Sequence, residues 1–258
     1  MIPRPWPPAA SYRRCYSLNE AALRAGQASR SSVHVGRRIM SWQHPVAEDL
    51  LPEFPIFPLP GALLLPRGRL PLNIFEPRYL AMVEDALANG RMFGMLQPNE
   101  NAPRGQTGPS LYRIGCLGRL SHFSETDDGR YLITLTGVSR FVVREELGMQ
   151  RGYRRISADF SAFAHDLEAP GRLPPGVRDQ VLESLRPYFD MTGIDANWDA
   201  IRAMPDAMLM TTLAMLCPFD TAEKQALLEA PTDADRAGDL LALLRMAVHE
   251  GDGPNLPS

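Results

Sequence analysis

Apolar and polar residues change their spacing several times between positions 54 and 98, and each change predicts a new structural element. Residues 70–74 alternate as expected for a β-strand with one buried face. Residues 77–88 then place leucine and valine at helical spacing behind a proline, and an Asn-Gly pair supplies a helix stop. Residues 91–96 form a short apolar run typical of a buried strand. This stretch therefore predicts a strand, a helix and a second strand with little chain between them.

Prolines interrupt the apolar segment that precedes these elements. Residues 54–59 have the composition of a strand, but Pro55, Pro58 and Pro60 fall within or beside it. Proline has no N–H to donate to a neighbouring strand, so we expect this segment to lie at an edge or rim of the sheet.

The strand pattern continues between residues 112 and 162. Asp128-Gly129 predicts a tight hairpin turn, and Gly137 predicts a bulge at which a strand can bend. Together with the earlier segments this gives about seven strands and one inserted helix. We therefore expect an α+β fold in which residues 40–163 form a small closed or nearly closed β-barrel. The later strands are expected at residues 112–123, 131–136, 138–144 and 156–162.

The apolar period changes from two to 3.6 after residues 164–176, a Pro- and Gly-containing segment that we interpret as a linker. Residues 177–250 predict several short helices, and residues 251–258 a frayed tail. Asp220 with Glu223, and Thr232 with Asp235, have the spacing of capping boxes. Helices this short do not persist alone, so we expect them to form a bundle that packs internally or on the barrel.

The first 39 residues hold seven arginines and one acidic residue, with no helical or strand period. This composition fits a disordered arm or a transit peptide. A third hypothesis is that translation begins at Met40. We favour a disordered or non-native extension.

Charge and cysteine content narrow the class of protein. Residues 164–258 carry 7 basic and 16 acidic side chains, which argues against a nucleic-acid footprint over the whole chain. Three widely spaced cysteines, Cys15, Cys116 and Cys217, suit reduced structural thiols. No apolar run approaches the length of a membrane helix. We expect a soluble cytoplasmic protein, or a mitochondrial one if residues 1–39 are a transit peptide.

One long motif resembles a known family. Residues 54–87 read FPIFPLPGALLLPRGRLPLNIFEPRYLAMVEDAL, which is similar to the start of the amino-terminal domain of Lon proteases. Residues 112–120, 135–143 and 218–229 agree with the same family, so the resemblance spans roughly residues 54–249. It implies a PUA-like barrel followed by helices, and a role in recognising protein substrates.

The chemistry of the rest of a Lon protease is absent from the sequence. The chain has one lysine, Lys224, and no G-x-x-x-x-G-K-[ST] motif, so neither a phosphate-binding loop nor an ordinary serine-lysine pair can be assembled. The five histidines lack metal-ligand spacing. We therefore expect a stand-alone binding module with no catalysis, cofactor or metal.

Candidate contacts for a protein substrate surround the predicted helix entry. Arg78 and Tyr79 could line a groove there with neighbouring polar groups and a flexible methionine. The structural alternative is that Glu76 bonds the helix start, Arg78 ties down a strand and Met95 fills the core. The candidate set is Asn73, Glu76, Arg78, Tyr79, Met95 and Gln97.

Two classes of partner follow from these residues. The first is unfolded or damaged protein segments, with a separate Lon-type protease as a further partner; no membrane partner is expected. The alternative is RNA, bound through a basic strip on the barrel. Against it, interleaved acids suggest that these arginines form an ordinary solvated face. The strip would comprise Arg113, Arg119, Arg140, Arg144, Arg151, Arg154 and Arg155.

Overall fold

The computed structural model describes residues 50–105 and 107–251, and its elements confirm the α+β prediction. The expectations for residues 1–39 and for the last seven residues lie outside this part of the chain. The β part comprises β1 (Glu53–Pro58), β2 (Arg69–Ile74), α3 (Pro77–Ala88), β3 (Met92–Leu96), β4 (Ile114–Glu125), β5 (Tyr131–Gln150) and β6 (Tyr153–Asp159). The 3-10 helix η3 (Ser161–Leu167) leads to α4 (Val177–Thr192), α5 (Trp198–Ala203), α6 (Asp206–Leu216), α7 (Thr221–Glu229) and α8 (Asp233–Gly251).

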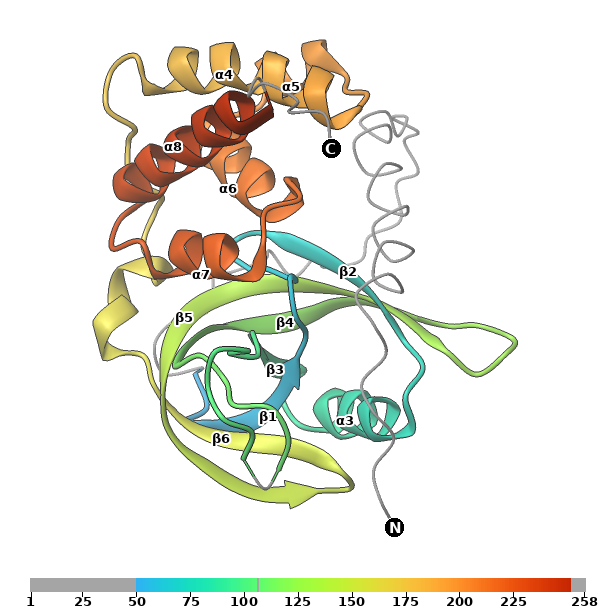
Figure 1. Cartoon of the computed structure of the whole chain (residues 1–258). Coiled ribbons are helices and arrows are strands. Elements are labelled where there is room, and N and C mark those ends of the chain that lie inside the picture. Colours follow the sequence, from blue (N-terminus) through green and yellow to red (C-terminus); the bar gives the residue numbers. More distant parts are fainter. Residues whose placement is uncertain (1–49, 106, 252–258) are drawn as a thin grey trace, which may run out of the picture.

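The six described strands form one sheet that closes on itself. The strand order is β2-β5-β4-β3-β1-β6, and β5 also pairs with β6, which completes a ring of five strands (Figure 1). β1 and β3 run parallel, and the other pairs are antiparallel. β2 lies outside the ring and pairs with β5. The expected nearly closed barrel with one inserted helix is thus present.

The strand segments expected on either side of Gly137 belong to one long strand, β5, which runs through this glycine without a break. Leu117 pairs with Ser139 and Gly118 with Gly137, so Val138 is an extra residue in the ladder. The bulge predicted at Gly137 is therefore confirmed.

The expectation that the first strand lies at a sheet edge is wrong. β1 pairs with β6 through residues 53–56 and with β3 through residues 56–58. Pro55 thus lies opposite β6 alone and Pro58 opposite β3 alone, so each proline has a neighbouring strand on one side only. Among the described strands, β2, which contains Pro71, is the one that pairs on a single side along its whole length.

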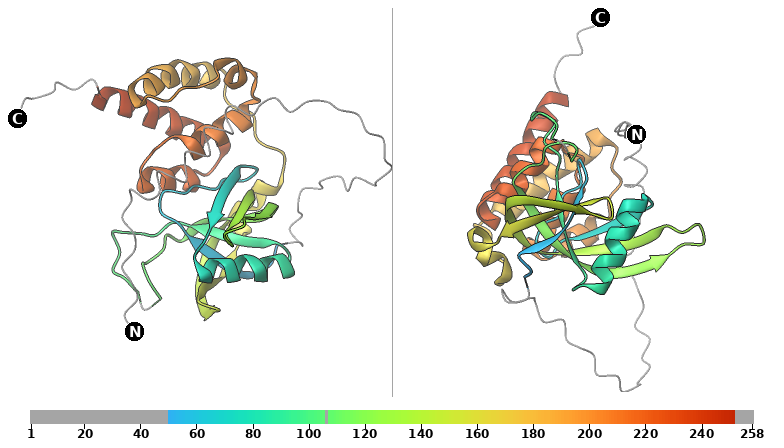
Figure 2. Two further views of the ribbon diagram at one scale, coloured as in Figure 1. Left: turned by 90° about the vertical axis from the view of Figure 1, so that its right-hand side faces the viewer. Right: turned by 90° about the horizontal axis from the view of Figure 1, so that it is seen from below.

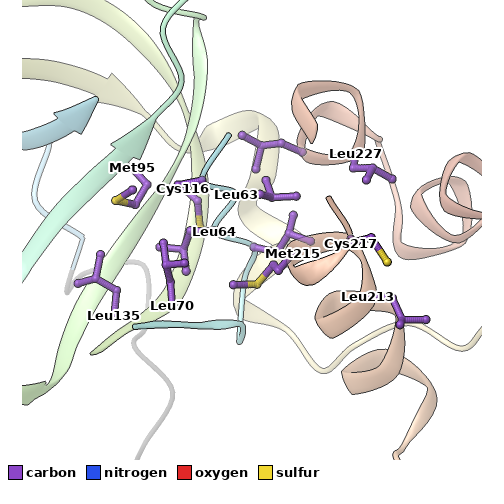
Figure 3. Close-up of a cluster of buried hydrophobic side chains, with 14 of the residues drawn as sticks. Leu63, Leu64, Leu70, Met95, Cys116, Leu135, Leu213, Met215, Cys217 and Leu227 are labelled. Atoms are coloured by element: carbon purple, nitrogen blue, oxygen red, sulfur yellow. The ribbon is translucent and has the colours of Figure 1, made fainter. Parts of the chain in front are cut away.

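The helices gather over one end of the ring and share a core with it (Figures 1 and 2). One buried cluster contains residues of the barrel and of α4, α6, α7 and α8. Figure 3 shows its centre, where Leu63 and Leu64 lie between the strand residues and the helix residues Leu213, Met215 and Leu227. Burial of this shared apolar surface fixes the helices on the barrel.

Both predicted capping boxes are confirmed. Asp220 accepts a hydrogen bond from the Glu223 backbone, and Glu223 accepts one from the Asp220 backbone, both at 2.7 Å. Thr232 and Asp235 exchange the equivalent bonds at 3.1 Å.

Among the described helices, none combines the length and apolar character needed to cross a membrane.

Polar side chains also connect the barrel to α7. Gln97 accepts a hydrogen bond from the Gly61 backbone at 3.2 Å and donates to the Thr221 carbonyl at 3.2 Å and to Gln225 at 3.1 Å. Lys224 is buried, and its Nζ donates to the Gly61 carbonyl at 2.8 Å. These bonds orient α7 on the loop that precedes β2.

Burial of Lys224 makes stability depend on pH. Burial lowers the pKa of Lys224 to about 8, so the unfolded chain binds this proton more tightly than the folded chain. At neutral pH the folded chain therefore bears the free-energy cost of burying a charged ammonium group. This cost decreases as the pH rises through the folded-state pKa and the group loses its proton. We expect the free energy of unfolding to rise by about 1 kcal/mol between about pH 8 and 9. The measurement is the free energy of unfolding in urea at pH 8 and pH 9, for the parent chain and for Lys224→Met. The rise should be present in the parent chain and absent from the variant. An equal rise in both would assign the pH dependence to other groups.

Candidate functional site

The structure separates the six candidate residues into interior and surface groups. Tyr79, Met95 and Gln97 are buried, Met95 in the shared core and Gln97 beneath α7. Asn73 lies on β2, while Glu76 and Arg78 lie at the entry of α3 and are partly exposed. The six residues therefore do not form one groove.

Glu76 and Arg78 close the entry of α3 by pairing with each other. Arg78 Nη2 lies 2.8 Å from Glu76 Oε2, and its guanidinium lies 4.5 Å from the centre of the Tyr79 ring. That ring in turn lies 4.4 Å from the ring of Phe57. Glu76 makes no side-chain cap hydrogen bond, so the alternative in which it bonds the helix start is wrong. The pair belongs to the packing between α3 and β1.

The edge of β2 that faces away from β5 has no partner strand among the described residues. The Gly137 backbone donates to the Gly68 carbonyl at 2.8 Å, and the register pairs Leu70 with Leu135. In an antiparallel ladder, bonded pairs alternate, so the even-numbered residues of β2 bond to β5. The backbone groups of Arg69, Pro71 and Asn73 therefore point away from β5.

Exposed apolar side chains lie beside this edge. Leu132 of β5 pairs with Asn73 and is 38% exposed, and Phe75, which follows β2, is 58% exposed. The side-chain oxygen of Asn73 is buried and has no hydrogen-bond partner among the described residues. We call Arg69, Pro71, Asn73, Phe75 and Leu132 the β2 edge surface. It combines exposed apolar side chains with backbone groups that have no partner strand among the described residues.

The β4–β5 hairpin extends the sheet beyond the ring next to β2 (Figure 1). Phe123 of β4 pairs with Ile133 and is partly exposed, with its ring 5.0 Å from that of Tyr131. Because neighbouring residues of a strand point to opposite faces, Phe123 and Leu132 lie on opposite faces of the hairpin. Both faces of this projection are thus partly apolar.

The proposed basic strip is largely neutralised. Arg140 is buried against Asp166, and Arg154 is buried with its Nε 2.5 Å from Glu146. Further ion pairs join Arg144 to Asp159, Arg151 to Glu84 and Asp85, and Arg155 to Glu53, and Arg113 donates to the Val143 carbonyl. Paired arginines attract phosphate less strongly than unpaired ones, which weakens the RNA alternative.

A cavity of about 240 Å³ is bordered by α3, β1 and the β5–β6 hairpin. On its wall, the Tyr153 hydroxyl donates to Asp85 at 2.7 Å, and this bond holds the pKa of Asp85 below its usual value. Arg151 also bonds Asp85, so the polar groups of this wall already satisfy one another.

Nucleophiles and metal ligands are poorly placed in the described residues. Burial raises the pKa of Cys217 to about 12 and also raises that of Cys116, so both thiols stay protonated at neutral pH. No group of three or more His, Cys, Asp or Glu side chains in residues 50–105 and 107–251 could hold a metal ion.

Comparison with known proteins gives a consistent result. A protein-family model described as the ATP-dependent protease La (LON) substrate-binding domain matches residues 53–246. The chain is 28% identical over 199 residues to Lon protease 1 of Bdellovibrio bacteriovorus, covering 74% of this chain and 24% of that protein. It is 28% identical over 182 residues to Lon protease 2 of Sorangium cellulosum, covering 68% and 22%. The chain thus spans about a quarter of the length of these relatives.

Two solved structures share the fold. A Lon N-terminal domain protein from Xanthomonas campestris superposes with a TM-score of 0.53 at 24% identity, covering 74% of this chain and 98% of that one. The N-terminal domain of a Mycobacterium avium complex Lon protease gives a TM-score of 0.53 at 13% identity, covering 78% and 100%. The barrel and its helices are therefore an arrangement found in other chains.

Proposed function

Because the chain belongs to the family of LON substrate-binding domains, we propose that it is a non-catalytic binding module that recognises exposed segments of protein substrates. The β2 edge surface is the proposed contact. The observation that carries this proposal is the position of Phe75 and Leu132, both exposed, beside a strand edge that has no partner strand in the described part of the chain. Unfolded segments expose apolar side chains and unpaired backbone groups, and this surface offers a complement to both.

The proposal predicts that the affinity for an unfolded protein depends weakly on the sequence of the protein and on the salt concentration. Apolar burial depends weakly on ionic strength, whereas phosphate contacts weaken steeply as salt rises. The RNA alternative therefore predicts the opposite salt response. The paired arginines favour the protein alternative, since few of their charges remain for phosphate.

We expect a Phe75→Ser, Leu132→Ser double variant to bind an unfolded protein about tenfold more weakly, because it loses the exposed apolar contacts. The probe is fluorescent α-lactalbumin, kept unfolded by reduction and carboxymethylation, titrated against the full chain at low and high salt. Single-stranded RNA is titrated in parallel.

The matched control is Met149→Ser, which removes an equally exposed apolar side chain, 57% against 58% for Phe75. Met149 lies near the far end of β5, away from β2. Unchanged affinity in this control supports the proposed contact. Equal weakening in both variants would overturn it, and so would binding to RNA alone that disappears at high salt.

A further inference from the structure

We propose that the β2 edge surface captures its ligand as an added β-strand, so that an extended polypeptide segment pairs with β2 through backbone hydrogen bonds. This inference rests on the proposed function and specifies the conformation of the substrate. It follows from the topology: β2 is paired on one side alone along its whole length, whereas each of the other five described strands has neighbours on both sides over at least part of its length.

The open edge carries a defined set of donors and acceptors. Arg69 and Asn73 direct an N–H and a C=O outward, and Pro71 directs a C=O alone. In the described part of the chain these outward groups have no hydrogen-bond partner. An antiparallel or parallel neighbour strand meets these groups at alternate residues.

Pro71 makes the expected pairing asymmetric. The N–H groups of a ligand strand can donate hydrogen bonds to the carbonyls of Arg69, Pro71 and Asn73. The carbonyls of the ligand can accept hydrogen bonds from the N–H groups of Arg69 and Asn73 alone, because proline has no N–H. Recognition thus depends on N–H groups at every second residue of the ligand. The intervening N–H groups point away from β2 and should contribute nothing.

N-methylation of a peptide tests this alternation directly. The probe is a fluorescent peptide of about ten residues in which valine and threonine alternate, so that its two faces differ. Two further versions carry N-methyl groups on the valines or on the threonines. We expect one version to bind the full chain about tenfold more weakly and the other to bind almost as well as the parent peptide.

Equal affinity of all three peptides would overturn strand addition and leave the proposed function standing, because side-chain recognition survives N-methylation. Equal loss in both methylated versions would also overturn it. If none of the three peptides binds, the test is hydrogen exchange of the full chain with the unfolded α-lactalbumin probe. The amides of Arg69 and Asn73 should become protected from exchange when the probe binds. Binding without such protection would refute the proposal. A dimer formed through β2 before ligand is added would likewise contradict it.

Discussion

Replacement of Arg140 by alanine is expected to lower the free energy of unfolding by about 3–5 kcal/mol, since it breaks a buried ion pair and leaves its partner charged. Arg140 is 1% exposed and Asp166 is 5% exposed. The guanidinium approaches Asp166 at 2.9 Å through both Nε and Nη2, and the Arg140 backbone N–H donates to the same carboxylate at 2.8 Å.

This ion pair connects three parts of the chain. Arg140 comes from β5 and Asp166 from η3, and Nη1 of Arg140 donates to the carbonyls of Leu228 and Ala230 at the end of α7, at 3.1 and 2.6 Å. The ring of Phe163 lies 4.4 Å from the guanidinium. The alanine variant would therefore leave a buried carboxylate and two helix-end carbonyls without the guanidinium that neutralises or bonds them.

The measurement is urea denaturation of Arg140→Ala beside Arg144→Ala. Arg144 also lies on β5 and pairs with Asp159 at 2.9 Å, but its side chain is 65% exposed, so its loss should cost less than about 1 kcal/mol. An Arg140→Met, Asp166→Leu double variant should lose less stability than Arg140→Met alone, because neither charge of this pair then stays buried without the other. Similar losses for Arg140→Ala and Arg144→Ala would show that the buried pair is not important for stability.

The sequence predicted local structure well where the pattern is local. The alternation of β2, the helix α3 with its Asn-Gly stop, the hairpin turn and both capping boxes follow from residues within a few positions of each other. The family resemblance is confirmed by the match over residues 53–246. These are the features for which no distant contact is needed.

The wrong predictions concern features that depend on tertiary contacts. Arg140 was grouped with surface arginines, because alternation along β5 does not reveal which face the later segment around Asp166 covers. The prolines of β1 suggested an edge, whereas the register shows that β6 and β3 cover different halves of the strand. Both cases depend on partners far away in the chain.

The candidate site shows the same limit. Of the six candidate residues, Asn73 alone belongs to the β2 edge surface, and Phe75 and Leu132 were not among them. A local signal existed for Leu132, since an apolar residue between Tyr131 and Ile133 breaks strand alternation. The open edge itself emerges only from the sheet order, which periodicity does not specify.

Replacement of Gly137 by alanine is expected to cost about 3 kcal/mol or more of the free energy of unfolding, because the new methyl group has no space. An added Cβ would lie 2.0 Å from the carbonyl oxygen of Leu65 and 2.7 Å from its carbonyl carbon. These are backbone atoms, so a change of rotamer cannot relieve the overlap. Gly137 also donates to the Gly68 carbonyl and accepts from the Arg67 N–H, both at 2.8 Å.

The matched control for Gly137→Ala is Gly148→Ala in the same strand, where an added Cβ meets no atom within 4 Å. We expect that control to stay within about 0.5 kcal/mol of the parent chain in urea denaturation. Since the segment held by Gly137 leads directly into β2, Gly137→Ala should also weaken binding of the unfolded probe, whereas Gly148→Ala should not. Equal stability of the two variants would show that the Leu65 segment does not lie against β5, and the placement of the β2 edge would then have to be revised.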